Sequence, residues 1–89
     1  MLNPVHTKQF NRDIKLNKKR GKDFKKIKEI MTFLIEKKTL VSKYKDHKLV
    51  GNFTECRECH IEPDWLLIYR VENDSIFFIR TGTHSDLFR

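Results

Sequence analysis

Three histidines, His47, His60 and His84, each stand beside a turn or a strand end that the sequence predicts. Histidine ionises near pH ~6.5, so two imidazoles can act as general base and general acid at neutral pH. Cleavage of RNA by its own 2′-hydroxyl needs such a base, an acid for the leaving 5′-oxygen, and positive charge on the phosphate. Imidazoles and an arginine supply all three without a metal. Scattered structural histidines are the alternative, and spacing alone favours that alternative.

The stretch at residues 60–65 joins two strand patterns by a tight turn and places an imidazole, a carboxylate and an indole within six residues. In a functional interpretation, Asp64 orients a histidine and stabilises its charged form, while Trp65 shapes the pocket. Ordinary turn chemistry at Asp64 and ordinary core packing of Trp65 explain the same residues. Without further information, the local sequence favours that second interpretation.

Residues 56–60 read Cys-Arg-Glu-Cys-His, the C-x-x-C-H string of covalent haem attachment. The segment has the period-2 pattern of a strand, which sends Cys56 and Cys59 to opposite faces of a sheet. They cannot then hold one porphyrin or one metal ion, and a zinc site needs further ligands. We therefore interpret both cysteines as small strand residues and expect no metal and no cofactor.

The charge of the chain is divided unevenly along its 89 residues, although its net value is +7. Residues 1–50 hold 15 Lys/Arg and 5 Asp/Glu, a net +10, whereas residues 51–89 hold 4 and 7, a net −3. A basic half suggests a surface for a polyanion beside a site that carries its own carboxylates. Solvated helix faces would explain the lysines equally well.

The length predicts one domain, residues 1–89, with a modest core. The sequence contains no 18-residue apolar run, so we expect no membrane association. The first residues lack the apolar segment of a signal peptide, and we therefore expect a cytoplasmic protein.

Apolar periodicity predicts two helices, at residues 8–19 and 24–35, after a brief strand within residues 1–6. A long loop at 39–54 follows, and Gly51–Asn52 marks a turn within it. Period-2 or strand-rich segments at 56–61, 65–71 and 75–81, separated by tight turns, predict an antiparallel meander. The fold class is therefore α+β, with the helices on one sheet face and the site on the other.

Three blocks of the sequence carry a resemblance to a known family: D-H-x-L-x-G at residues 46–51, R-E-C-H-I-E-P-D-W-L-L-I-Y at 57–69, and R-T-G-T-H-S-D-L-F at 80–88. The chain resembles the YafQ branch of the RelE/ParE toxin superfamily, the endoribonuclease toxins of bacterial type II toxin–antitoxin pairs. The resemblance implies a β-α-α-β-β-β fold with two N-terminal helices packed on one face of a mainly antiparallel sheet. The first 43 residues match only in helix layout and basic character.

The same resemblance implies the site residues and the partners. His47, His60, Asp64 and His84 match the family's catalytic positions, and Phe88 matches a phenylalanine that follows the last histidine. Substrate-binding roles are expected for Phe88 and for three further residues: Glu58, Trp65 and Arg80. The implied partners are mRNA, the ribosome and a cognate antitoxin, with operon DNA bound only through the antitoxin. We expect His84 and His47 to form the acid/base pair, with Arg80 neutralising the phosphate and Phe88 positioning a base.

A different class of function stays open at this point. Because the N-terminal half is so basic, the chain could dock on RNA, or on an acidic protein, without cutting. Loss of growth arrest on His84→Ala substitution would distinguish catalysis from simple docking.

Overall fold

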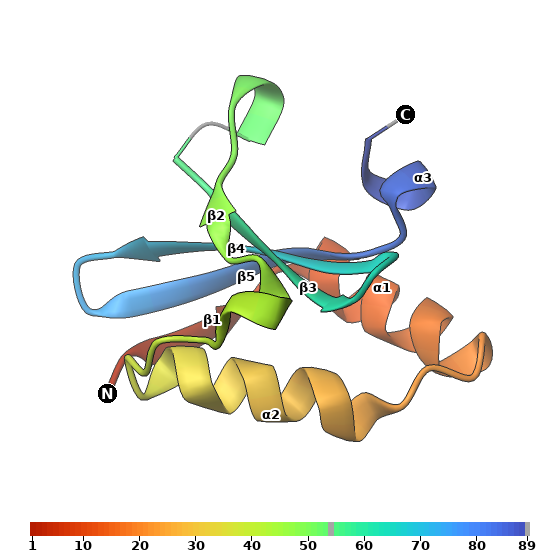
Figure 1. The fold of residues 1–89 in the computed structure, drawn as a ribbon, viewed down its shortest axis with the longest axis horizontal. Helices are drawn as coiled ribbons and strands as arrows, with labels where there is room; N and C mark the ends of the chain where they lie inside the picture. The colour runs from red at the N-terminus through yellow and green to blue at the C-terminus, as the bar shows by residue number, and fades with distance from the viewer. Residues whose placement is uncertain (54, 89) are drawn as a thin grey trace.

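The structure is a computed structural model that describes residues 1–53 and 55–88. It contains one five-stranded sheet in the order β1-β5-β4-β3-β2, with helices α1 and α2 on one side (Figure 1). Strand β1 pairs in parallel with β5, and the other neighbours are antiparallel. The predicted α+β fold is confirmed. The elements are β1 Asn3–His6, α1 Lys8–Lys19, α2 Phe24–Ile35, η1 Ser42–Tyr44, β2 His47–Lys48, η2 Gly51–Phe53, β3 Arg57–Glu62, β4 Trp65–Glu72, β5 Ser75–Gly82 and α3 His84–Leu87.

Both long helices begin where the sequence offers a capping side chain. Thr7 accepts a hydrogen bond from the Phe10 backbone N–H at 2.9 Å, and Asp23 accepts one from the Lys25 N–H at 2.9 Å. Gly21 has φ +85°, a left-handed conformation that favours glycine just after the end of α1. Helices α1 and α2 therefore start and stop at the predicted residues.

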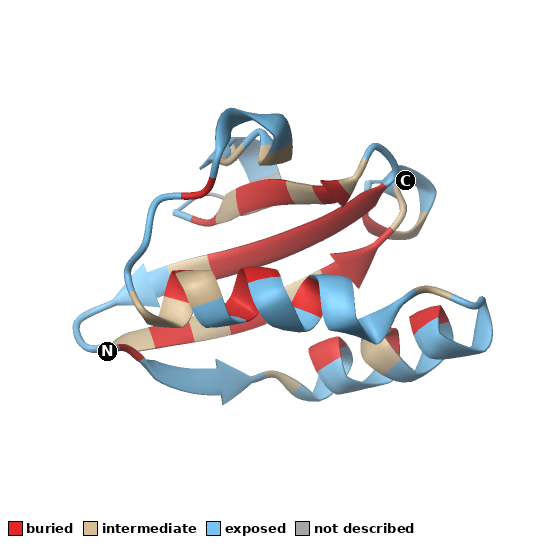
Figure 2. Cartoon of the chain, turned by 60° about the horizontal axis from the view of Figure 1, so that its bottom comes forward, coloured by how far each residue is buried: buried red, intermediate tan, exposed pale blue. Residues whose placement is uncertain are grey.

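The predicted apolar stripe of α2 faces the sheet, and Figure 2 shows its buried residues on that side. The buried residues of α2 are Ile27, Ile30, Met31 and Leu34. Helix α1 buries Phe10 and Asn17 on one face and leaves Leu16 exposed. The buried face of α1 also contains Asp13, a charged residue whose partners are described below.

The sheet has a hydrophobic cluster on each face. The larger cluster lies under the helices and includes Trp65, Leu67 and Phe78. A smaller cluster on the opposite face contains Cys56, Leu66, Ile68 and Leu87. This second cluster anchors α3 and the loop before β3 on the face that the long helices leave uncovered.

The predicted loop at 39–54 contains two 3₁₀ turns and the short strand β2, and its last residue, Thr54, lies outside the described residues. Strand β2 pairs only through His47 with Glu58 and Lys48 with Arg57. This pairing fixes His47 opposite Glu58 across the strand pair. No helix among the described residues is both long and apolar enough to cross a membrane.

Candidate active site

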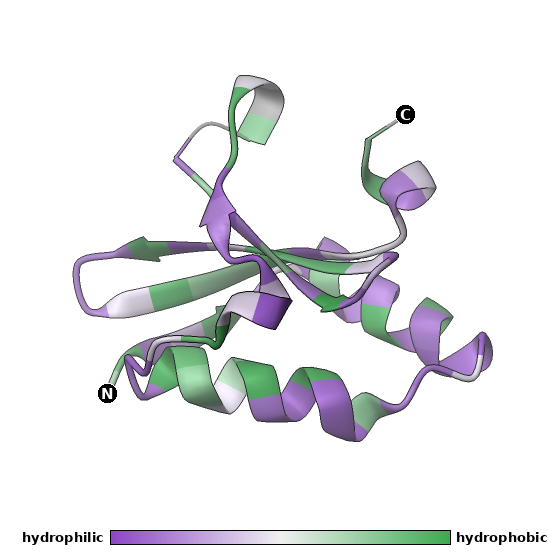
Figure 3. Cartoon of the chain, viewed as in Figure 1, coloured by the Kyte–Doolittle hydropathy of each residue, from purple (hydrophilic) through white to green (hydrophobic). Residues whose placement is uncertain are grey.

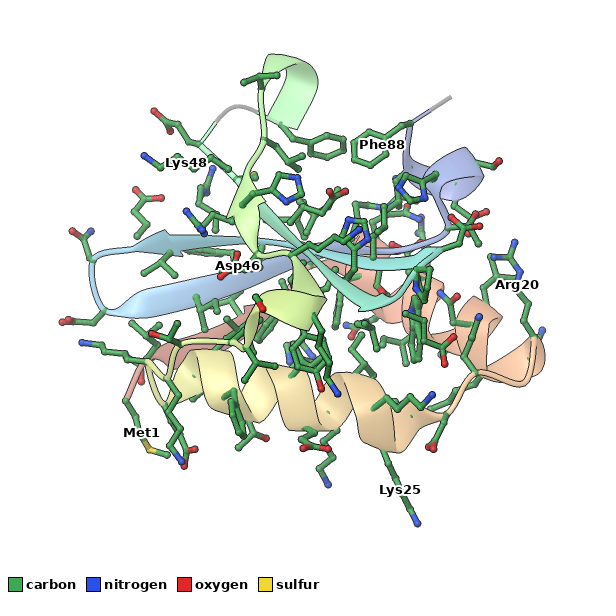
Figure 4. The ribbon with its side chains drawn as sticks, in the orientation of Figure 1. Met1, Arg20, Lys25, Asp46, Lys48 and Phe88 are labelled. Carbon is green, nitrogen blue, oxygen red and sulfur yellow. The ribbon has the colours of Figure 1, made fainter. Side chains whose placement is uncertain are left out.

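Two segments rise from the uncovered face of the sheet and form the walls of the candidate active site. One is the β2–η2 segment, and the other is α3 with the C-terminal residues (Figure 1). Figure 4 shows Phe88 on this side, while Lys25 projects from α2 on the far side. The floor between the walls is formed by β3 and by the turn after it.

Four rings follow one another across this floor. The ring centroids of His47 and His60 are 6.1 Å apart, those of His60 and His84 are 5.7 Å apart, and those of His84 and Phe88 are 6.4 Å apart. The structure therefore brings together the three histidines that come from separate parts of the sequence. Their side chains are accessible to different degrees, with relative exposures of 49% for His47, 16% for His60 and 53% for His84.

Asp64 holds His84 through two contacts. The His84 backbone N–H donates to Asp64 Oδ1 at 2.9 Å, and His84 Nδ1 lies 2.6 Å from the same oxygen. The hydrogen bond from the His84 backbone N–H, followed by the contact with the ring, holds the pKa of Asp64 below its usual range. An ionised Asp64 keeps the proton of the imidazole on Nδ1 and leaves Nε2 available to accept one.

Glu58 lies between the other two histidines. Its Oε2 is 3.0 Å from His47 Nε2 and 3.4 Å from His60 Nε2, and the Glu58 side chain is only 7% exposed. His47 Nδ1 lies 2.6 Å from the carbonyl oxygen of Lys45, which can only accept, so Nδ1 carries a proton. Both nitrogens of His47 therefore face oxygen acceptors.

The loop that carries His47 is fixed from behind by Asp46, a residue to which the sequence analysis assigned no role in the site. Its Oδ1 accepts hydrogen bonds from the Tyr69 hydroxyl at 2.7 Å and from Arg57 Nε at 3.1 Å. Burial, together with the bond to Asp46, raises the pKa of Tyr69, so its hydroxyl stays protonated. Asp46 could have been identified from the D-H pair, because a carboxylate beside a histidine often positions the loop.

Helix α3 places His84 and Phe88, and its short length makes its N-terminal cap important. The Thr83 N–H donates to Asp86 Oδ2 at 2.9 Å and the Asp86 N–H donates to Thr83 Oγ1 at 3.1 Å, a reciprocal capping box. Arg20, at the end of α1, contacts both oxygens of Asp86 at 2.6 and 3.2 Å. The hydrogen bonds from Arg20 and then from the Thr83 N–H hold the pKa of Asp86 well below its usual range.

We expect Asp86→Ala to lower the unfolding free energy by about 1 kcal/mol, the usual effect of losing an N-cap interaction. For a domain of this size, that corresponds to a fall in Tm of roughly 4–8 °C. Because the pKa of Asp86 is lowered in the folded chain, its contribution is present above the unfolded carboxyl pKa and is lost as the pH falls. Thermal unfolding at pH 7 and near pH ~3 measures this. Arg20→Ala keeps the capping box and should cost less, and equal Tm values at pH 7 for Asp86→Ala and wild type would contradict the prediction.

Phe88 is 42% exposed, whereas its neighbour Leu87 is buried in the smaller cluster. The ring of Phe88 meets Phe53 edge-on, with centroids 5.7 Å apart, so the two walls of the site touch through these aromatic residues. The sequence analysis did not include Phe53. An aromatic residue next to a predicted turn is a weak signal, and only the fold shows that it approaches Phe88.

Two of the expected substrate-binding residues, Trp65 and Arg80, are held by contacts outside the group of histidine rings. Trp65 is 1% exposed, belongs to the core under the helices, and donates from Nε1 to Thr81 Oγ1 at 3.0 Å. Its indole therefore supports the Asp64 turn from below rather than lining the cleft. Arg80 is bound by Asp13 of α1, with Nε at 2.7 Å and one terminal nitrogen at 3.2 Å. Among the described residues, the other terminal nitrogen of Arg80 has no hydrogen-bond partner.

The two cysteines lie in different hydrophobic clusters, Cys56 on the uncovered face and Cys59 under the helices. The prediction that they occupy opposite faces is confirmed, and the haem interpretation loses its basis. Burial raises the pKa of the Cys59 thiol, which disfavours the thiolate that a metal would need. Within residues 1–53 and 55–88, no group of three or more His, Cys, Asp or Glu side chains is arranged to hold a metal ion.

The basic residues form the outer surfaces of the two long helices. Figure 3 shows hydrophilic residues along α1 and along the outer side of the first half of α2. The two basic helices therefore lie on the opposite side of the sheet from the three histidines. Lys22 and Lys26 connect these sides, because both contact Glu62 at the end of β3, at 3.0 and 2.7 Å.

A sequence profile of the family "Bacterial toxin of type II toxin-antitoxin system, YafQ" matches residues 2–89 of the chain. The chain is 47% identical over 81 residues to the mRNA interferase toxin YafQ of Escherichia coli strain K12. That alignment covers 90% of this chain and 88% of the relative.

Solved structures show the same similarity over the whole chain. The toxin chain in the crystal structure of the Escherichia coli DinJ–YafQ complex matches with a TM-score of 0.92 and 42% identity, covering 100% of both chains. A metal-bound toxin from Helicobacter pylori matches with a TM-score of 0.93 and 39% identity, covering 99% of this chain and 100% of the other.

Proposed function

Because this chain belongs to the YafQ family of toxins from bacterial type II toxin–antitoxin systems, we propose that it cleaves mRNA by general acid/base catalysis without a metal. The family and the similarity to an mRNA interferase identify it as an endoribonuclease toxin. The observation that carries the proposed mechanism is the convergence of three imidazoles on the uncovered side of the sheet. Two carboxylates, Asp64 and Glu58, lie beside these rings and differ in burial.

His84 is the general base in this mechanism. Its Nε2 takes the proton of the RNA 2′-hydroxyl, and the 2′-oxygen attacks the neighbouring phosphorus. Asp64 keeps the ring in the required tautomer and stabilises the imidazolium that forms, as the aspartate of a catalytic triad does. The P–O5′ bond breaks, leaving a 2′,3′-cyclic phosphate on one fragment.

His60 is the general acid, and His47 supplies charge. Both nitrogens of His47 face the acceptors Lys45 O and Glu58 Oε2, so this ring is suited to holding a positive charge near the phosphate. Only Nε2 of His60 lies near Glu58, and its Nδ1 can donate to the leaving 5′-oxygen. This assignment differs from the expected pair of His84 and His47, because His60 takes the place of His47 in it. Phe88 positions a base by stacking, and the free terminal nitrogen of Arg80 contributes to phosphate neutralisation.

The relative in the DinJ–YafQ complex assembles with an antitoxin, and we propose a cognate antitoxin partner for this chain as well. Substrate mRNA held on the translating ribosome is the proposed setting of cleavage, with the basic helices against the ribosomal RNA. That setting is in the cytoplasm. Any contact with operon DNA is proposed to run through the antitoxin.

The products of cleavage in the presence of EDTA test this mechanism. Incubation of the purified toxin with a translating mRNA should give 5′-hydroxyl ends and 2′,3′-cyclic phosphates, at the same rate before and after chelation. The Helicobacter pylori relative was crystallised with metal bound, so a second arm adds back divalent metal. Cleavage that requires metal, or that leaves 5′-phosphates, would contradict the mechanism. RNA binding without cleavage would instead support a docking module.

A further inference from the structure

A basic pocket of about 600 Å³ lies beside the active site at the edge of the sheet. Its walls come from α2, from the η1 segment and from the end of β3, and they carry the side chains of Lys26, Lys43, Tyr44, Lys45 and His60. Strand β2 pairs with only the first two residues of β3. The rest of this edge, residues 59–62, is left without a strand partner among the described residues and borders the pocket.

The pocket and the catalytic cleft share a wall. His60 lines the pocket, and its ring is also 5.7 Å from that of His84, centroid to centroid. Lys45 contributes its side chain to the pocket and its carbonyl oxygen to His47 Nδ1, at 2.6 Å. An RNA strand bound at His60 could therefore extend directly into the pocket.

The charge of the pocket suits a phosphate group. Glu62 is one of two acids on the walls, and it is already paired with Lys22 and Lys26. The other acid, Glu29, shares the pocket with Lys43 and Lys45, for which the described part of the chain provides no ion-pair partner. The balance is positive, and a phosphate between Lys43 and Lys45 would be bound by two ammonium groups.

The pocket also offers a surface for the apolar part of a nucleotide. The Tyr44 ring is half-buried and has Lys43 Nζ 5.1 Å from its centroid. Aromatic rings stack on unpaired bases, and an adjacent cation adds to that attraction. A groove that combines an aromatic ring with lysines is a typical single-stranded nucleic acid site.

We propose that this pocket binds the nucleotide on the 3′ side of the cleaved bond, with Lys43 and Lys45 on the following phosphate and Tyr44 against the base. The inference rests on the proposed function, because the direction follows from His60 protonating the leaving 5′-oxygen. The pocket would then set the register of the RNA across the three histidines. It also gives this toxin a substrate contact that does not depend on Phe88.

Salt-dependent binding tests the proposal without requiring cleavage. Fluorescence anisotropy measures binding of a labelled hexauridylate to the His84→Ala protein from low to moderate salt. Each phosphate contact on a single strand contributes about 0.7 to the slope of log K against log salt. In this background, Lys43→Gln with Lys45→Gln should reduce the magnitude of the slope by about 0.7, because both lysines are proposed to bind one phosphate. The control pair, Lys8→Gln with Lys15→Gln, removes the same charge from exposed positions of α1 and should change it by less than half as much.

A cleavage assay locates the contact. With the catalytic histidines intact, adding one nucleotide 3′ of the cleaved dinucleotide should lower KM for wild type about tenfold, and Lys43→Gln/Lys45→Gln should abolish that gain. Equal slopes for the two lysine pairs, or an unchanged gain, would overturn the proposal. Loss of antitoxin binding with normal RNA binding would also overturn it and assign the pocket to a protein. A cleaving His84→Ala protein would refute the catalytic mechanism alone, since the binding arm does not depend on it.

Discussion

Replacement of His84 by alanine should reduce the rate of mRNA cleavage by about 10²–10⁴-fold, the range expected for loss of one acid or base. The substitution removes the ring that faces the cleft and keeps the backbone N–H that donates to Asp64 at 2.9 Å. The Thr83–Asp86 capping box is also untouched, so α3 should keep its position. The loss should therefore appear in kcat, in single-turnover cleavage of a ribosome-bound reporter, and not in the unfolding transition.

His6→Ala is the matched control for this experiment. His6 is the fourth histidine, and its ring packs against Phe10 and Phe78 on the helix side, 5.3 and 5.6 Å away between centroids. It should leave the cleavage rate within a few-fold of wild type. Cleavage by His84→Ala at the wild-type rate, in a protein that melts normally, would remove His84 from the mechanism.

The pH profile of the wild-type rate should be bell-shaped. The base must be neutral and the acid protonated, so activity falls on both sides of neutrality. The pKa of Asp64 lies below its usual range, and Asp64 is therefore ionised throughout the interval in which histidines titrate. The fall in cleavage rate on the acid side of the profile therefore reflects protonation of an imidazole and not of Asp64. Asp64→Asn should reduce the rate, because the imidazolium that the base becomes would lose the negative charge that stabilises it.

Local patterns in the sequence were sufficient to predict the two long helices and the three strands of the meander, whereas β2, α3 and the two 3₁₀ turns were not predicted. The stripe of α2 repeats every 3.6 residues and the strands after residue 56 are separated by tight turns, so periodicity and turn residues predicted both. The parallel pairing of β1 with β5 joins segments about 70 residues apart, with Asn3 opposite Ser75. No local pattern in either segment encodes that pairing, and it was not predicted.

The types of residue in the candidate site could be predicted from the sequence, whereas their contacts could not. The resemblance selected the histidines, but Glu58 was expected only as a substrate-binding residue. Its position between His47 and His60 depends on the register of β2 against β3. Likewise, only tertiary packing shows that Trp65 faces the core and that Arg80 is held by Asp13. A side chain's partners across the sheet are properties of the fold, which one sequence does not specify locally.

Glu58→Gln should have the second-largest effect, a fall in the cleavage rate of about 10- to 100-fold at pH 7. The substitution keeps the shape of a buried side chain and removes the negative charge beside His47 Nε2 and His60 Nε2. A nearby carboxylate favours the protonated form of an imidazole. Without it, the two nitrogens lose their carboxylate partner, and positive charge on the rings is stabilised less in the transition state.

Thermal unfolding separates this role from a structural one. A substitution that only loosens β3 would lower the Tm together with the rate, whereas Glu58→Gln should lower kcat in a protein that unfolds at nearly the wild-type temperature. Glu72→Gln is the control, because it removes the same charge from an exposed residue of β4 that pairs with Arg70 at 3.4 Å. Its cleavage rate should match that of wild type. If Glu58→Gln cleaved at the wild-type rate, the assignment of His60 as an acid supported by Glu58 would be wrong.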